Sequence, residues 1–251
     1  MNADVLNIVI PMAGYGSRFS AAGYALPKPL LPVRGRPMIE VVVENLRPRM
    51  PHRFVFICQR QHLENFGLRS LLGRVAPGAE IIGIDGVTEG AACTVLLAAQ
   101  FIDSDAPLMI ANCDQYVAVN MDVYFDRMSA GGYDGYIMTM KADDPKWSFI
   151  ALGQDDTVVG VYEKKVVSNE ATVGIYNYLR GHDFISCAQE MIAKEDRVNG
   201  EYYVAPVYNY LIERGARVGF MNIGADRAGM YGLGVPADLQ YFNDLQEWPR
   251  K

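Results

Sequence analysis

The residues with the clearest chemistry in this sequence lie within positions 8–38. Gly14, Gly16 and Arg18 follow an apolar run, and Lys28 lies ten residues after Arg18 inside a Pro-Lys-Pro turn. Glycines allow backbone N–H groups to turn inward around an anion, and a helix that follows adds its positive N-terminal end. Arg18 and Lys28 supply two permanent cations. This spacing predicts a pocket for a polyphosphate.

A single carboxylate, Asp114, follows a second apolar run at residues 107–112. Ligands of parallel α/β sheets bind at the carboxyl ends of the strands, so we expect Asp114 to face the same crevice as the glycine turn. Mg²⁺ prefers oxygen ligands and often binds one or two carboxylates together with phosphate oxygens. The sequence therefore predicts magnesium at Asp114.

Apolar strand patterns alternate with helical patterns around these residues. The predicted strands are 5–12, 53–58, 79–84, 107–112, 135–140, 171–178 and 217–222. The predicted helices are 38–46, 61–72, 93–102, 183–193, 204–214 and 237–246. This alternation favours an α/β, Rossmann-like three-layer fold with a mixed, mostly parallel central sheet. A hairpin of 149–152 and 158–162 adds a small β-hairpin substrate lobe, roughly 141–209, within a single domain of residues 1–251.

Composition excludes several classes of protein. The 251 residues are 50% hydrophobic and 21% charged, as in ordinary globular domains, and the net charge is −6. Without a basic tract, the chain is not expected to bind nucleic acid. No apolar run reaches about 18 residues and no secretory signal pattern is present, so we expect no membrane span. The four cysteines lack a Cys-x-x-Cys pattern, which predicts free thiols in a reducing cytoplasm.

The motif Gly-x-Gly-x-Arg, followed by Pro-Lys-Pro-Leu-Leu-Pro-Val and a later Arg-Pro-Met, resembles the signature of the sugar-phosphate nucleotidyltransferases, or NDP-sugar pyrophosphorylases. Phe19 stands where a dinucleotide-binding motif needs its third glycine, and a P-loop Gly-Lys-Ser/Thr is absent. The resemblance implies transfer of NMP from an NTP to a sugar 1-phosphate or similar small phosphate, with Mg²⁺ as cofactor. It also implies a role in surface polysaccharide synthesis, and a homo-oligomer stays an open alternative.

The resemblance implies roles for further residues. Glu89-Gly90 corresponds to a segment that contacts the base and ribose, and Glu163-Lys164-Lys165 resembles a Glu-Lys-Pro that holds the sugar and its phosphate. Gly174 and Glu201 match sugar contacts. The predicted nucleotide-binding set is Ala13, Gly14, Gly16, Ser17, Arg18, Lys28, Glu89, Gly90 and Asp114. The predicted sugar-phosphate set is Glu163, Lys164, Gly174 and Glu201. The predicted catalytic set is Arg18, Lys28, Asp114 and Lys164.

The implied mechanism depends on alignment and charge rather than on covalent chemistry by the protein. Gly14 and Gly16 would cradle the triphosphate, and Arg18 would stabilise charge on the leaving pyrophosphate. Lys28 would touch the α-phosphate, and Lys164 would orient the attacking phosphate.

Three positions depart from the family pattern. The family tail reads Asp-x-Gly-Thr-Pro, and its aspartate is the second metal ligand, but Gly232 stands in that place. Asp226, six residues earlier, is one alternative ligand; otherwise the metal relies on Asp114, water and phosphate oxygens. Lys165 replaces a proline and Ser148 a glycine near the sugar, which affects the prediction of substrate more than that of reaction type.

Two other functions remain open at this point. A nucleotide-sugar-dependent glycosyltransferase has a similar sheet but normally shows Asp-x-Asp, whereas Gln115 and Tyr116 follow Asp114 here. A non-catalytic nucleotide-binding module would account for Gly232. The joint presence of the four predicted catalytic residues argues against that module.

Overall fold

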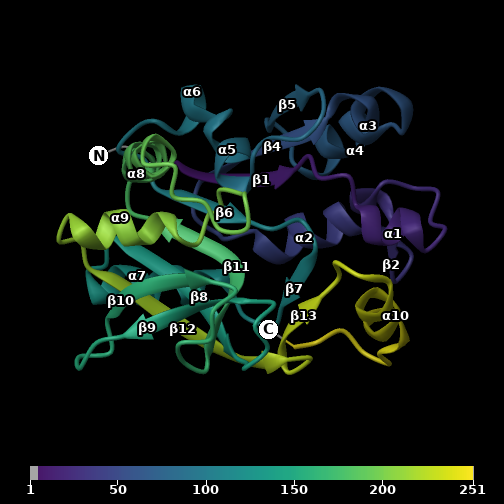
Figure 1. Cartoon of the computed structure of the whole chain (residues 1–251). Helices are drawn as coiled ribbons and strands as arrows, with labels where there is room; N and C mark the ends of the chain where they lie inside the picture. The colour runs from purple at the N-terminus through teal and green to yellow at the C-terminus, as the bar shows by residue number, and fades with distance from the viewer. Residues whose placement is uncertain (1–4, 251) are drawn as a thin grey trace.

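A twisted sheet of mostly parallel strands runs through the molecule (Figure 1). The computed structural model describes residues 5–250. Within them the sheet contains β1 (Leu6–Met12), β4 (His52–Gln59), β5 (Glu80–Ile84), β6 (Leu108–Ala111), β7 (Gln115–Val117), β8 (Gly135–Lys141), β9 (Ser148–Leu152), β10 (Val158–Glu163), β11 (Glu170–Tyr178), β12 (Val218–Asp226) and β13 (Gly229–Gly232). A separate hairpin joins β2 (Pro32–Val33) to β3 (Arg36–Pro37).

The strand order is β5-β4-β1-β6-β11-β8-β12-β13-β7, and the β9–β10 hairpin joins at β11. Strands β5, β4, β1 and β6 are parallel to one another. β11 lies antiparallel between β6 and β8, and β12 pairs parallel to β8. The sheet is therefore mixed but mostly parallel, as the sequence predicts.

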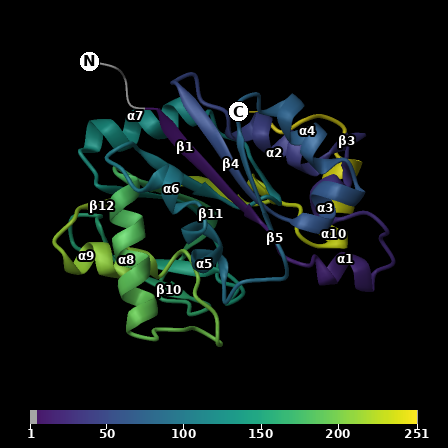
Figure 2. The same cartoon turned by 90° about the horizontal axis from the view of Figure 1, so that it is seen from above.

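Helices cover both faces of this sheet. They are α1 (Ser17–Ala21), η1 (Lys28–Leu30), α2 (Met38–Leu46), α3 (Arg60–Asn65), α4 (Leu68–Val75), α5 (Ala91–Leu96), α6 (Ala99–Ile102), α7 (Met121–Gly131), α8 (Gly181–Ala193), α9 (Val207–Glu213) and α10 (Pro236–Asp244). Figure 2 shows α2 and α4 on one side of β1 and β4, and α5, α6 and α8 on the other. The predicted three-layer α/β fold is confirmed.

Strand β1 shows why the apolar runs form buried strands. Its side chains alternate: Leu6, Ile8 and Ile10 lie in the core under α2, and Val9 lies in the core under α8. Successive side chains of a strand point to opposite faces, so a strand covered on both faces needs a continuous apolar run. Each such side chain stabilises the fold by roughly 1.5–3 kcal/mol relative to exposure.

Two predicted helices are each broken into two. The helix expected at 61–72 divides into α3 and α4 because Gly67 adopts a left-handed conformation, with φ 67°, between them. The helix expected at 93–102 divides into α5 and α6. There the N–H groups of Leu97 and Ala98 donate to Thr94 and Val95, three residues back, which ends the helix in a tight turn.

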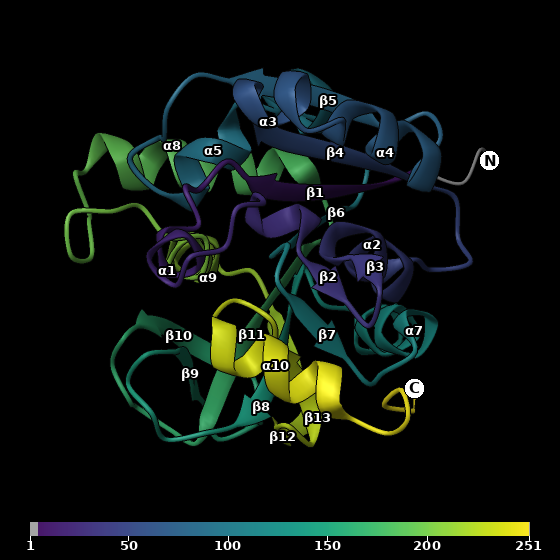
Figure 3. The same ribbon diagram turned by 90° about the vertical axis from the view of Figure 1, so that its right-hand side faces the viewer.

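The sequence reasoning also missed β7 and β13. Both are short, and β13 pairs antiparallel to β7, with Gly232 opposite Gln115. Figure 3 shows α10 lying over β13, with β7 beside it. This small addition to the sheet brings the Gly232–Gly234 segment next to Asp114, which lies directly before β7.

Two predictions from composition can also be compared with the structure. Within residues 5–250, none of the helices combines the length and the apolar character that a bilayer crossing requires. All four cysteines are free thiols, as predicted, and Cys58, Cys113 and Cys187 are buried.

Candidate active site

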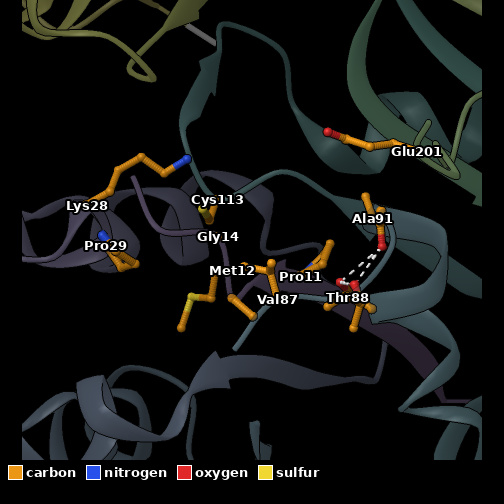
Figure 4. A pocket seen from close by; sticks show the side chains of 13 residues that line it. Pro11, Met12, Gly14, Lys28, Pro29, Val87, Thr88, Ala91, Cys113 and Glu201 are labelled. Atoms are coloured by element: carbon orange, nitrogen blue, oxygen red, sulfur yellow. Dashed lines mark hydrogen bonds between the residues drawn. The ribbon is translucent and has the colours of Figure 1, made fainter. Parts of the chain in front are cut away.

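A cavity of about 370 Å³ lies at the carboxyl ends of β1 and β6. Its walls include Ala13 and Gly14 after β1, Lys28 in η1, and Cys113 after β6. The segment before α5 supplies Val87, Thr88, Gly90 and Ala91. In Figure 4, Lys28 and Glu201 lie on opposite sides of the cavity. This position agrees with the rule that ligands of open α/β sheets bind outside the carboxyl ends of the strands.

The glycine turn leaves the backbone after β1 open to a ligand. A Cβ atom at Gly14 would meet no heavy atom within 4 Å, so the space beside it is free. Gly16 has φ 63°, which favours glycine, and begins the short helix α1. Buried Phe19 anchors that helix, and Arg18 on the same helix makes no hydrogen bond or ion pair with another described residue. Arg18 therefore presents an uncommitted cation beside the turn.

Lys28 and Asp114 form the central ion pair of the site. Lys28 Nζ lies 2.9 Å from Asp114 Oδ2, and both side chains are about one-quarter exposed. Burial by itself would lower the pKa of Lys28, but attraction to Asp114 outweighs it, so this pKa lies above its usual value. Burial raises the pKa of the neighbouring Cys113 thiol to about 11. At neutral pH the pocket thus holds a charged lysine and a neutral thiol.

The Gly232–Gly234 segment fits tightly around Asp114. Leu233 N–H donates to the Asp114 carbonyl at 2.8 Å, and a Cβ at Gly234 would lie only 2.5 Å from Asp114 Oδ2. A side chain at position 234 would therefore have to displace the Asp114 carboxylate. Gly232, which the sequence resemblance predicts to replace an aspartate, is less crowded, because a Cβ there would lie 3.3 Å from Asp238 Oδ2.

The residues present determine how a metal ion would fit. Within residues 5–250, no group of three or more His, Cys, Asp or Glu side chains is arranged to hold a metal. Asp226 is the exposed last residue of β12. One carboxylate plus phosphate oxygens is a normal Mg²⁺ donor set. The site therefore fits a magnesium ion that shares Asp114 with a bound phosphate chain.

The segment before α5 is joined to residues 201–203 by backbone hydrogen bonds. Tyr202 N–H donates to the Glu89 carbonyl at 2.9 Å, and Ala92 N–H donates to the Tyr202 carbonyl at 3.0 Å. A Cβ at Gly90, which has φ 136°, would overlap that carbonyl. The Glu89 carboxylate is 65% exposed and pairs with Arg197 at 2.5 Å. Gly90 thus allows close packing beside the cavity, and the Glu89 side chain is committed to Arg197.

Three of the four predicted sugar-phosphate residues, Glu163, Lys164 and Glu201, lie near one another. Lys164 Nζ donates to Tyr203 Oη at 2.8 Å and lies 4.9 Å from the centre of that ring. This hydrogen bond is the main cause that raises the pKa of Lys164. Burial raises the pKa of Glu163, although the hydrogen bond donated by Ser148 Oγ opposes the shift. Glu201 lies close enough to influence the pKa of both Glu163 and Lys164.

Gly174 is at a bulge in β11, with φ 76°, beside the end of β6. Asn112 N–H donates to the Gly174 carbonyl at 3.0 Å, and the Asn112 and Gln115 side chains fill the space that a Cβ at Gly174 would need. Gln115 is buried, and its Nε2 has no hydrogen-bond partner among the described residues. The sequence reasoning assigned no role to Asn112, Gln115 or Tyr203. In the sequence, the one feature that could have indicated them is that each lies within two residues of Asp114 or Glu201.

The predicted nucleotide-binding residues are only partly assembled around the cavity. Its walls contain Ala13, Gly14, Lys28 and Gly90. Gly16, Ser17 and Arg18 lie at α1 beside these walls, Asp114 contacts Lys28, and Glu89 pairs with Arg197. The structure therefore unites the glycine turn, Lys28 and Asp114, and it directs the Glu89 side chain elsewhere.

Comparison with known proteins gives consistent matches. The family model described as nucleotidyl transferase matches residues 8–221. A crystal structure of the nucleoside-diphosphate-sugar pyrophosphorylase from Vibrio cholerae RC9 is 27% identical, with a TM-score of 0.81, and the match covers 95% of this chain and 100% of that chain. A Bacillus anthracis structure assigned as a glucose-1-phosphate thymidylyltransferase has a TM-score of 0.74 at 19% identity, covering 97% and 98% of the two chains, which shows a similar fold alone.

A curated relative, the bifunctional protein GlmU of Cupriavidus metallidurans, is 27% identical over 94% of this chain and 50% of its own length. The GlmU of Methanococcus maripaludis is 24% identical over 68% of this chain and 39% of its own length. The chain spans about half the length, or less, of these relatives.

Proposed function

Because the chain belongs to the nucleotidyl transferase family, as the resemblance in its sequence predicted, we propose that it transfers NMP from an NTP to a sugar 1-phosphate, releasing pyrophosphate. A similar small phosphate is the alternative acceptor. One observation carries the proposal. Lys28, which pairs with Asp114, and Glu201, whose charge acts on Glu163 and Lys164, line opposite sides of one cavity. In-line transfer between two anions needs two such phosphate-binding places facing each other.

The nucleotide half uses backbone groups and fixed cations. The N–H groups after β1 face the phosphate chain beside Lys28, whose charge reaches the α-phosphate. Arg18 has no other partner among the described residues, and it stabilises the charge that grows on the leaving pyrophosphate. Gly16 and Ser17 position this arginine by starting α1 at the edge of the cavity.

The acceptor half uses side chains from the hairpin-rich lobe, roughly residues 141–209, within the single domain that the sequence predicts. Lys164, held by Tyr203, orients the attacking phosphate. Glu163 and Glu201 accept hydrogen bonds from hydroxyl groups of the acceptor. Gly174, which the resemblance assigns to the sugar, has the Asn112 and Gln115 side chains on the side where a Cβ would point. The lysine offsets repulsion between the two phosphates as they approach.

Asp114 would hold Mg²⁺, which when bound neutralises charge on the phosphate oxygens. Lys28 already contacts Asp114, so the carboxylate would be shared between Lys28 and the ion. Asp226 remains the candidate for a second carboxylate. We also propose that the protein works in the cytoplasm and in surface polysaccharide synthesis. Both proposals rest on the family resemblance alone.

A matrix of ATP, GTP, CTP, UTP and dTTP against a panel of sugar 1-phosphates and other small phosphates, with Mg²⁺ and a pyrophosphate readout, tests the proposal. We expect pyrophosphate release that depends on both partners. Arg18→Ala should lower kcat on the order of a hundredfold with the fold intact. Arg49→Ala is the matched control, because that side chain is 88% exposed, precedes the amino end of β4 and pairs with Asp122.

Three outcomes distinguish the open functions. Pyrophosphate from an NTP and a phosphate acceptor supports the transferase. Release of a nucleoside diphosphate from a nucleotide sugar identifies a glycosyltransferase instead. Nucleotide binding without any product identifies a non-catalytic module, and it overturns the proposal.

A further inference from the structure

Gln59 connects two loops that form walls of the cavity. It is the last residue of β4, which lies between β1 and β5 in the sheet, and its side chain is 2% exposed. Its Nε2 donates to the carbonyl of Ala13, which follows β1. The same Nε2 donates to the carbonyl of Gly86, which follows β5, at 2.6 Å. Both amide hydrogens are thus used, and the two carbonyl acceptors determine which way the amide faces.

These two carbonyls determine where two N–H groups point. In a trans peptide unit the C=O and N–H bonds point in opposite directions, and the described residues contain no cis peptide. The Ala13 carbonyl shares its peptide unit with Gly14 N–H, and the Gly86 carbonyl shares its own with Val87 N–H. By holding both carbonyls, Gln59 therefore turns both N–H groups away from itself.

Gly14 and Val87 both line the cavity, and neither N–H donates to another described residue. Gly14 lies on the wall that also contains Lys28, and Val87 precedes Thr88 on the wall before α5. The cavity thus has one free backbone donor at its phosphate end and one at the end expected to hold the nucleoside.

We propose that Gln59 is a positioning residue for the nucleotide: one buried amide orients the Gly14 N–H toward the phosphate chain and the Val87 N–H toward the nucleoside. This inference rests on the proposed function, because it assigns a triphosphate to this cavity. Preorganised backbone donors bind without a cost of reorganisation, so losing their alignment weakens nucleotide binding specifically.

The neighbouring residue Arg60 holds the same loop from outside. Its Nε lies 3.1 Å from Asp85, and its Nη2 donates to the Gly83 carbonyl at 3.0 Å. Both partners of the ion pair are about half exposed or more, so this pair contributes little to the loop position. The buried amide of Gln59 is the stronger constraint on the two walls.

A merely structural role for Gln59 predicts a different result. Removing any buried side-chain amide that makes two hydrogen bonds destabilises the fold, whether or not that amide orients backbone donors toward a ligand. Asn7 provides the matched control: its buried Oδ1 accepts two hydrogen bonds from Arg53, at 3.2 and 2.7 Å. Asn7 and Arg53 belong to the same strand pair, β1 and β4, but lie at the amino ends, away from the cavity.

The test compares Gln59→Met with Asn7→Leu and the wild type. Calorimetry with each of the five NTPs gives binding constants, and thermal unfolding gives stability. We expect Gln59→Met to weaken NTP binding and raise the KM for NTP about tenfold, with the KM for the acceptor changed by less than about twofold. Competition by inorganic tripolyphosphate and by the free nucleoside should both weaken. Asn7→Leu should lose comparable stability and retain nucleotide binding.

Gln59→Glu adds a readout that stability alone does not affect. A carboxylate at this position faces two carbonyl oxygens and repels them, whereas its protonated form restores one O–H donor. Relative to the wild type at the same pH, the KM for NTP of Gln59→Glu should therefore fall as the pH is lowered. If the ratio of the two KM values, Gln59→Glu to wild type, does not change with pH, the proposal is contradicted.

The remaining outcomes separate this inference from the proposed function. If wild type and Gln59→Met bind NTPs equally, or if Asn7→Leu weakens binding as much, Gln59 has no positioning role, whatever the turnover shows. If the wild type binds an NTP without releasing pyrophosphate, the proposed function fails, and the binding comparison still decides the role of Gln59. If the wild type binds none of the five NTPs, both are wrong.

Discussion

The two halves of the candidate site are built in different ways. The proposed nucleotide half lies against the buried parallel strands and consists of backbone turns, one ion pair and closely packed glycines such as Gly234. The acceptor half lies on the β9–β11 lobe and consists of side chains, such as Lys164 on Tyr203 and Glu163 with Ser148. Backbone geometry suits the triphosphate, which any NTP presents alike. Side chains suit the acceptor, which varies.

This difference predicts that substitutions in the two halves will change different kinetic constants. Changes in the nucleotide half should lower kcat and weaken NTP binding. Changes in the acceptor half should mainly raise the KM for the acceptor phosphate.

The largest effect is expected for Lys28→Met. It removes a preorganised cation and leaves Asp114 without its partner 2.9 Å away. We expect kcat/KM for NTP to fall by about 10²–10³. Steady-state kinetics with varied NTP measures this loss. Lys146→Met is the control, because that lysine is 56% exposed and its contacts, with Asp144 and the Trp147 ring, do not involve Lys28 or Asp114. A loss below about threefold would remove Lys28 from the nucleotide half.

Lys164→Met should act on the other half. Losing one charge-assisted contact to a phosphate should raise the KM for the acceptor about tenfold, with the KM for NTP nearly unchanged. Tyr203→Phe retains the ring but removes the hydroxyl that holds Lys164, so it should produce a smaller change in the same constant. Equal effects on both substrates would contradict the division into two halves.

The two tail glycines offer a closer comparison. Gly234→Ala places a Cβ 2.5 Å from Asp114 Oδ2 and must displace that carboxylate, whereas Gly232→Ala places one 3.3 Å from Asp238 Oδ2. We expect kcat to fall about fivefold to tenfold for Gly234→Ala and by less than about twofold for Gly232→Ala. The dependence of the rate on Mg²⁺ concentration should change in Gly234→Ala alone. Identical kinetics for the two variants would show that Asp114 can move freely.

The smallest effect is a pH dependence of stability at Glu163. Burial raises the pKa of Glu163 above its ordinary value of 4.5. The folded state therefore holds this proton more tightly, and its contribution to stability is lost as the pH rises above 4.5. As the pH rises above 4.5, the free energy of unfolding of the wild type should fall relative to that of Glu163→Gln. Urea denaturation at several pH values measures the difference, and a constant difference would contradict the shift.

Much of the fold could be predicted because its signals are local. The bounds of α2 agree with the predicted 38–46, and β1 begins one residue after the predicted start. Apolar side chains at every position of 5–12 except Asn7 predict a strand buried on both faces, and Pro48 predicts the end of the helix before it. The division of 61–72 at Gly67 was missed because a glycine within a helical pattern ends a helix only in some contexts.

Within the site, the sequence by itself predicts the residues of the proposed nucleotide half. Gly14, Gly16 and Arg18 are near neighbours in the chain, so their joint presence at one turn follows from local geometry. Only the tertiary structure decided that Lys28 meets Asp114 across 86 residues and that the Glu89 carboxylate pairs with Arg197. It alone decided that Gln59 joins the loops after β1 and β5. Such contacts depend on strand order, and the order of parallel strands is set by packing over the whole sheet, which no local pattern records.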